Sequence, residues 1–180
     1  MTEGNNRWIL AIDPGSKESG YILVPWGSLR PTMMGKEENG QVLDIIQGVI
    51  LALATEEGVR LDIAIEMVES YGMSVGVDVF QTCIWIGRFT QQAKNTIVSG
   101  MDVHVDYVTR KQEKMALCHS MKATDTTIRQ ALADRFAPGE KNFGKGTKKE
   151  PGFFYGFRAD IWSAMAIAAT YHDLKITEEE

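Results

Sequence analysis

The sequence lacks several features that would place it in a structural class at once. Only two cysteines occur among its 180 residues, Cys83 and Cys118, and their spacing matches no metal-binding motif. We therefore expect neither a disulfide framework nor a cysteine-based zinc site, and we predict a reducing, cytoplasmic location. Because Cys83 stands among apolar neighbours, we predict that it lies in the core.

Long apolar runs are also missing. No stretch approaches the roughly 20 apolar residues of a membrane-spanning helix, so we expect no membrane association. The start of the chain, MTEGNNRW, lacks the apolar segment of a signal peptide. The hydrophobic fraction of 44% and the charged fraction of 24% are typical of globular proteins. We predict one domain over residues 1–180, with a core from about 7 to 175.

Charge is distributed unevenly along the chain. Residues 107–149 contain ten Lys and Arg but four Asp and Glu, whereas the rest of the chain contains nine and twenty. The net charge of −5 argues weakly against nucleic-acid binding, but a basic third on an acidic body favours one charged face. A solvated surface segment is the alternative explanation.

The hydrophobic pattern predicts an α/β protein with a mixed central sheet flanked by helices. A β-meander comes first, followed by alternating helices and strands. The predicted strands are 8–13, 20–25, 30–34 (the weakest), 61–66 and 102–108. The predicted helices are 41–54, 75–98, 124–136 and 159–174, and residues 137–157 form a basic loop.

Three acidic residues stand at the ends of predicted elements. Asp13 and Glu66 each follow a short apolar strand, and Asp160 opens the last helix. Any one of them alone would suggest a helix cap or a surface acid. Together they suggest convergence on a cation, because burying unpaired carboxylates is costly. Hard oxygen donors favour Mg²⁺ or Mn²⁺.

The segments around these acids resemble a known family. ILAIDPGSKESGYILV (9–24), DIAIE (62–66) and ADIWSAMAIAATYHD (159–173) are similar to the RuvC family of Holliday junction resolvases, in particular to the short members encoded by phages and prophages. The resemblance implies an RNase H-like fold, a homodimer, and symmetric hydrolysis of four-way DNA junctions with two Mg²⁺ or Mn²⁺ ions per site. It implies 5′-phosphate and 3′-hydroxyl products, and it maps Asp13, Glu66 and Asp160 onto the metal-binding acids.

The chain departs from the family pattern at two places. Ser163 stands where the family usually has a fourth acid, three residues after the position of Asp160. Lys111 lies near one of the family's basic residues, while Asp125 occupies the place of another, with Lys122 as a possible substitute. We predict that Lys111 and Lys122 neutralise charge developing on the phosphate.

Further residues are candidates for DNA contact. Tyr71 follows Glu66 in a glycine-containing turn and either wedges into a junction or packs on the domain. The aromatic residues of 153–157 either stack on bases or anchor the basic loop. We expect phosphate contacts from basic side chains in and after this loop: Lys141, Lys145, Lys148, Lys149 and Arg158. The three histidines, at 104, 119 and 172, are not expected to be ligands, and no small-molecule cofactor is expected.

The helix predicted over 75–98 carries more apolar residues than one core-facing stripe needs. Val79, Cys83 and Ile86 repeat at helical spacing, while Trp85 and Phe89 point elsewhere. We predict that this helix forms the interface of a homodimer.

Three alternatives remain open on the sequence alone. The same acids would serve a nuclease that acts on flaps, forks or RNA–DNA hybrids. A junction-binding protein that does not cut is a second alternative. The Asp-Pro-Gly opening also resembles the phosphate loop of the actin and sugar-kinase superfamily, but that fold needs two lobes and a much longer chain.

Overall fold

The computed structural model describes residues 6–70, 72, 74–96 and 98–179. Five strands form one sheet in the order β3-β2-β1-β4-β5. Their bounds are β1 (Arg7–Asp13), β2 (Glu18–Pro25), β3 (Met33–Glu38), β4 (Arg60–Met67) and β5 (Asp102–Thr109). The β1–β2 and β2–β3 pairs are antiparallel, whereas β1–β4 and β4–β5 are parallel. The predicted mixed α/β sheet is confirmed.

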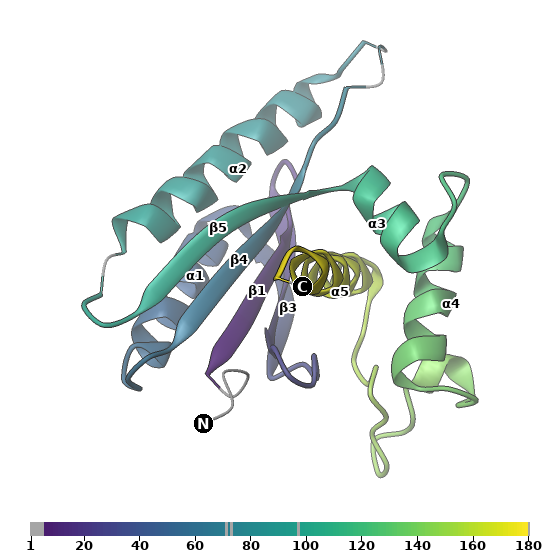
Figure 1. The fold of residues 1–180 in the computed structure, drawn as a ribbon. Helices are drawn as coiled ribbons and strands as arrows, with labels where there is room; N and C mark the ends of the chain where they lie inside the picture. Colours follow the sequence, from purple (N-terminus) through teal and green to yellow (C-terminus); the bar gives the residue numbers. More distant parts are fainter. Residues whose placement is uncertain (1–5, 71, 73, 97, 180) are drawn as a thin grey trace.

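Helices cover both faces of this sheet (Figure 1). One face carries α1 (Asn39–Leu53) and α2 (Val77–Asn95), and the other carries α5 (Ala159–Glu179). The remaining helices lie beside α5: α3 (Arg110–Cys118), α4 (Asp125–Phe136) and the short 3₁₀ turn η1 (Asn142–Gly144). None of the helices in the described ranges is long and apolar enough to cross a membrane.

The central strand β1 is buried from both sides. Ile9 and Ala11 pack in the cluster that includes α5, whereas Leu10 and Ile12 pack in the cluster that includes α1 and α2. This explains why β1 is a continuous apolar run rather than an alternating one. The apolar run ends at Asp13, which is the last residue of the strand.

Two element predictions need correction. The third strand runs from Met33 to Glu38 rather than over 30–34, because Leu29 adopts a left-handed turn (φ 51°) and Pro31 has no N–H to donate. Helix α3 was missed, although Thr109 and Gln112 form a reciprocal capping box at its start.

The prediction that Cys83 lies in the core is wrong, since this residue is exposed. The buried side of α2 is formed by Ile86, Phe89 and Ala93, with Trp85 partly buried beside them. Phe89 therefore faces the core rather than a second surface. Phe80 and Ile84, whose apolar character favours the core side, are exposed.

The basic loop is held by its aromatic residues. Phe154 and Phe157 are almost completely buried and pack around Trp162 of α5. Phe153 stacks on Phe136 with ring centroids 4.9 Å apart, while Tyr155 remains exposed. Phe154 and Phe157 therefore anchor the loop in the core.

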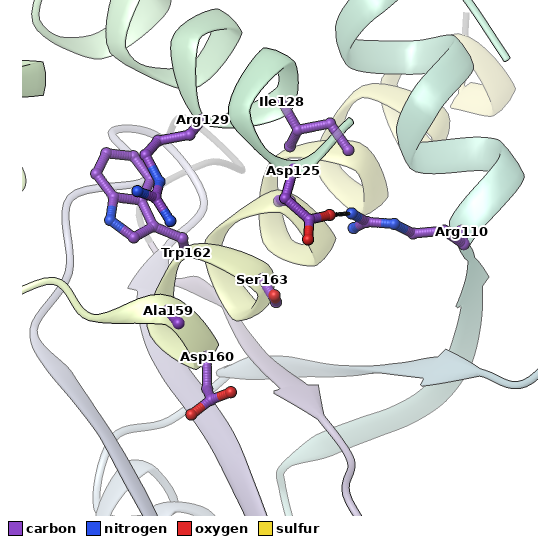
Figure 2. A pocket seen from close by; sticks show the side chains of 9 residues that line it. Arg110, Asp125, Ile128, Arg129, Ala159, Asp160, Trp162 and Ser163 are labelled. Atoms are coloured by element: carbon purple, nitrogen blue, oxygen red, sulfur yellow. Dashed lines mark hydrogen bonds and ion pairs between the residues drawn. The ribbon is translucent and has the colours of Figure 1, made fainter. Parts of the chain in front are cut away.

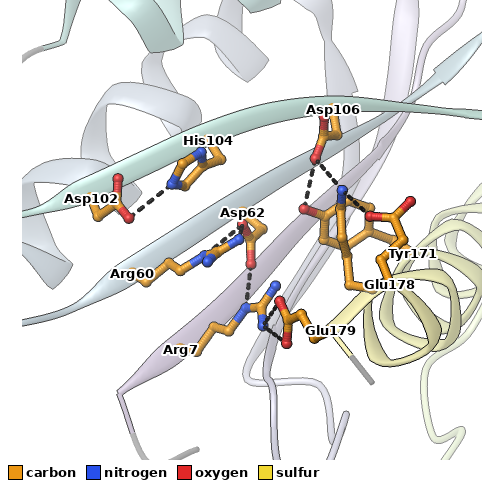
Figure 3. Close-up of polar contacts among 10 residues, drawn as sticks. Arg7, Arg60, Asp62, Asp102, His104, Asp106, Tyr171, Glu178 and Glu179 are labelled. Atoms are coloured by element: carbon orange, nitrogen blue, oxygen red, sulfur yellow. Dashed lines mark hydrogen bonds and ion pairs between the residues drawn. The ribbon is translucent and has the colours of Figure 1, made fainter. Parts of the chain in front are cut away.

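A group of charged residues lies near the start of β1, beside β4 and the end of α5 (Figure 3). Asp62 is fully buried, and its carboxylate accepts from Arg7 Nε at 2.6 Å and from Arg60 Nε at 3.0 Å. Arg7 also pairs with Glu179. Because two arginines compensate the single buried carboxylate, this cluster joins β1, β4 and α5 rather than offering a cation site.

Candidate metal centre

The sheet brings two of the three predicted acids together. Parallel pairing sets Ile12 of β1 opposite Ile65 of β4, so Asp13 and Glu66 follow at the carboxyl ends of neighbouring strands. The two side chains are close enough to influence each other, because the charge of Glu66 adds to the effect of burial in raising the pKa of Asp13.

Asp160 reaches the same place from the first turn of α5. Its backbone packs against Gly20 of β2, which is the register partner of Asp13. A Cβ at Gly20 would lie 2.6 Å from the Asp160 carbonyl oxygen, so only glycine allows this approach. Ser163, one helical turn further on, is close enough to Asp13 to lower its pKa, against the larger opposing effect of burial. All three predicted acids thus belong to one site.

Burial and mutual repulsion dominate the electrostatics. Burial, then the charges of Glu66 and Asp160, raise the pKa of Asp13 to about 8. Burial raises the pKa of Glu66 too, and the next contribution is the charge of Glu113 on α3. Several carboxylates therefore repel one another in a poorly solvated region. A divalent cation bound between them would reduce this repulsion.

The donor set fits Mg²⁺ or Mn²⁺, because it consists of hard carboxylate and hydroxyl oxygens. Within the described residues, however, no three acidic, histidine or cysteine side chains are arranged to hold an ion as they stand. Asp160 Oδ2 lies 3.0 Å from Lys36 Nζ. A metal ion at Asp160 would therefore share this carboxylate with Lys36 or displace the lysine.

The turn after Asp13 is fixed by a polar network. The Gly15 N–H donates to Ser19 Oγ at 3.2 Å, Ser19 donates to Asn39 Oδ1 at 2.6 Å, and Asn39 Nδ2 donates to the Gly15 carbonyl at 3.0 Å. A Cβ at Gly15 would lie 2.3 Å from the Glu18 carbonyl oxygen. Ser19 and Asn39, which the sequence analysis did not single out, are buried and hold the turn.

The two predicted lysines, Lys111 and Lys122, are both on the surface. Lys111 Nζ pairs with Glu69 Oε1 at 3.3 Å, and Lys122 is exposed in the turn before α4. Two cations that the sequence did not single out stand beside the acids. Lys36 pairs with Asp160, and the charge of Arg110 acts on Glu66.

Two openings meet at Asp160. A cavity of about 180 Å³ is lined by Arg110, Asp125, Arg129, Asp160 and Ser163 among others, and Figure 2 shows Arg110 reaching Asp125 across it. A wider hollow of about 440 Å³ on the other side is lined by residues of the β1–β2 turn and by Asp13, Lys36 and Asp160. Asp160 is therefore accessible from both sides.

The predicted DNA-contacting residues are mostly on the surface. Lys141, Lys148 and Lys149 are exposed and Lys145 is half-buried. Arg158 is exposed, and its carbonyl accepts the first backbone hydrogen bonds of α5, from Ile161 and Trp162. Tyr71 lies outside the described residues.

Comparison with known proteins shows the fold. No family model and no curated protein matches this chain. Among solved structures, RuvC of T. thermophilus in complex with Holliday junction substrate superposes with a TM-score of 0.60 at 17% identity, covering 94% of this chain and 96% of that one. A second Thermus thermophilus RuvC structure gives 0.56 at 18% identity, with the same coverage.

This chain has a RuvC-like fold. The RNase H-like architecture predicted from the sequence is thereby confirmed over nearly the whole chain. At this level of identity the similarity shows that the strands and helices are arranged alike. It does not show the activity, which has to be inferred from the site.

Proposed function

We propose that this protein is a metal-dependent endonuclease that resolves four-way DNA junctions. The observation that carries the proposal is the half-buried Asp13–Glu66 pair beside Asp160, at the carboxyl ends of the two central parallel strands of a RuvC-like sheet. Acidic side chains whose pKa values are raised by burial and by one another are typical of functional sites.

Asp13, Glu66 and Asp160 would hold Mg²⁺ or Mn²⁺, two ions per site. Such ions would activate water and stabilise charge on the phosphate and the leaving 3′ oxygen. The protein's own residues would orient the substrate. Lys36, once released by Asp160, has its ammonium beside the hollow where a phosphate would enter, while Lys111 and Lys122 remain proposed contacts of the DNA backbone.

A nucleic-acid strand needs a path across the site. The hollow beside Lys36 and the cavity beside Arg110 and Arg129 lie on either side of Asp160, and each contains basic groups. The basic loop, with Lys141, Lys145, Lys148 and Lys149, adds positive charge nearby in the chain. We propose that these charges bind phosphates of the junction arms and that Tyr71 contacts unpaired bases.

Symmetric cutting of a junction needs two active sites. Helix α2 exposes Val77, Phe80 and Ile84, with 73%, 59% and 48% of their surfaces accessible. Their spacing of three and four residues forms one stripe opposite the buried face of the helix. We propose that a second copy of the chain covers this stripe and that two copies cut opposite strands.

The proposal is tested with purified protein and end-labelled substrates: a four-way junction, a flap, a fork, an RNA–DNA hybrid and a linear duplex, each with Mg²⁺, Mn²⁺ or EDTA. We expect paired, metal-dependent nicks in the junction and little cutting of the linear duplex. Preferential cutting of flaps or hybrids would assign a different nuclease activity. Tight junction binding without cutting in either metal would assign a binding protein instead.

A further inference from the structure

Helix α3 contributes a carboxylate that sequence reasoning did not connect with the site. Glu113 has no accessible surface. It lies in the first turn of α3, directly after β5, and β5 pairs in parallel with β4 so that Val108 is opposite Glu66. The first turn of α3 is therefore placed at the same edge of the sheet as the acids.

Only half of this carboxylate is satisfied. Glu113 Oε2 accepts from Arg110, but among the described residues Oε1 is buried without any hydrogen-bond partner. Leaving a buried carboxylate oxygen unpaired is costly on general grounds. Arg110 is bound through its other terminal nitrogen to Asp125, and it makes no hydrogen bond to this oxygen.

Electrostatic effects show that the unpaired oxygen belongs to a carboxylate close to the proposed ligands. Burial and then the charge of Glu113 raise the pKa of Glu66. Burial raises the pKa of Glu113 to about 7, and the charge of Asp13 adds to this rise. Arg110 compensates only one of these neighbouring carboxylates well. The site therefore has more buried negative charge than the protein's own cations balance.

We propose that Glu113 is a further acidic residue of the metal centre, which directs its unpaired Oε1 to a bound divalent cation or to water on that cation. This rests on the proposed function only in assuming that Asp13 and Glu66 bind metal. A cation there would satisfy the orphaned oxygen and offset the repulsion among the carboxylates of Asp13, Glu66 and Glu113. Arg110, which pairs with the other oxygen of Glu113, then competes with the metal ion for the charge of this carboxylate.

The test measures Mn²⁺ binding without DNA, by calorimetry at constant pH, so that it is independent of cutting. Asp13→Asn serves as the positive reference. Glu113→Gln keeps the size of the side chain and should weaken Mn²⁺ binding roughly tenfold to a hundredfold. Asp125→Asn removes the other, exposed partner of Arg110 and should leave the Mn²⁺ affinity within about twofold.

Arg110→Gln separates a metal-directed role from a purely structural one. If Glu113 serves the metal, removing its competing cation should leave Mn²⁺ affinity unchanged or higher. If Glu113 only positions Arg110, both variants should weaken binding equally, and that result would overturn the inference. Should Glu113→Gln not fold, hydrogen exchange of the wild-type protein decides: Mn²⁺ should protect the amides of 110–118, and protection limited to β1 and β4 would contradict the proposal.

Failure of this inference can be distinguished from failure of the proposed function. Mn²⁺ binding that depends on Asp13 but not on Glu113 would remove Glu113 and leave the nuclease proposal intact. Binding that depends on both residues, in a protein that cuts no DNA, would support the inference while contradicting the nuclease. Absence of Mn²⁺ binding by the wild-type protein would overturn both.

Discussion

The carboxylate of Asp160 is bound to the ammonium of Lys36, with 3.0 Å between Oδ2 and Nζ. The strand register explains this pairing, because Gly20 stands between Asp13 on one side and Lys36 on the other. Asp160 packs over Gly20 and therefore lies within reach of both. The lysine thus competes with any metal ion for the acid that completes the site.

The first prediction follows from this competition. Lys36→Gln should tighten Mn²⁺ binding a few-fold, because Asp160 no longer has to leave a cation. The effect should stay small, since the Lys36 side chain is 44% accessible and the pair is screened by solvent. Calorimetry on the metal-free protein measures it, and weaker Mn²⁺ binding by the variant would show that Lys36 does not oppose the metal.

The second prediction concerns the close approach of β2 and α5. Gly20→Ala places a methyl group 2.6 Å from the Asp160 carbonyl oxygen, and neither backbone can easily move. We expect unfolding free energy to fall by about 1–3 kcal/mol and cleavage to fall further. Gly48→Ala is the matched control, because a Cβ there meets nothing within 4 Å and the position is inside α1. This control should stabilise by about 0.5–1 kcal/mol in urea unfolding. Equal stability of the two variants would refute the close approach.

The third prediction is a pH dependence of the metal-free protein. The Asp13 pKa is raised from 3.8 to about 8 in the folded state. A raised carboxyl pKa stabilises the fold below the unfolded pKa, and this stability is lost as pH rises through about 8. Unfolding free energy should therefore fall between pH 5 and pH 8. Asp13→Asn should flatten the profile, and an unchanged slope in that variant would assign the dependence to other groups.

Much of this site could be predicted from the sequence, and the reasons are specific. Asp13 and Glu66 follow apolar strands that are buried on both faces, and Asp160 opens an apolar helix, so local patterns locate them. Lys36 was missed because its position beside Asp160 depends on how β3 pairs with β2. The sequence placed this strand at 30–34, which does not include Lys36. Register is a property of pairing between segments, and hydrophobic pattern alone does not fix it on an edge strand.

Other residues could not be placed by periodicity. Glu113 stands in a helix too short for a clear apolar stripe, and only the Thr109 capping box marked its start. In α2 the apolar residues form two stripes, and the sequence does not say which one faces the sheet. Cys83 was assigned to the wrong stripe for this reason.

The fourth prediction concerns the basic loop. Replacing Lys141, Lys145, Lys148 and Lys149 with alanine should weaken binding to every DNA form, because such charges act through counterion release. The slope of log affinity against log salt should become shallower by roughly one unit for each phosphate that the variant no longer neutralises. Fluorescence anisotropy at several salt concentrations measures both. Unchanged binding together with abolished cutting would instead place the loop in the active site.

The central claim is that Asp13 and its neighbouring acids form a metal-dependent nuclease site. The most direct measurement compares wild-type protein with Asp13→Asn on a labelled four-way junction, with cleavage followed in Mg²⁺ or Mn²⁺ and binding followed in EDTA. The account predicts paired nicks by the wild-type protein, no nicks by the variant, and similar junction affinity for both. Cleavage retained by Asp13→Asn, or junction cleavage by the wild-type protein in EDTA, would contradict it.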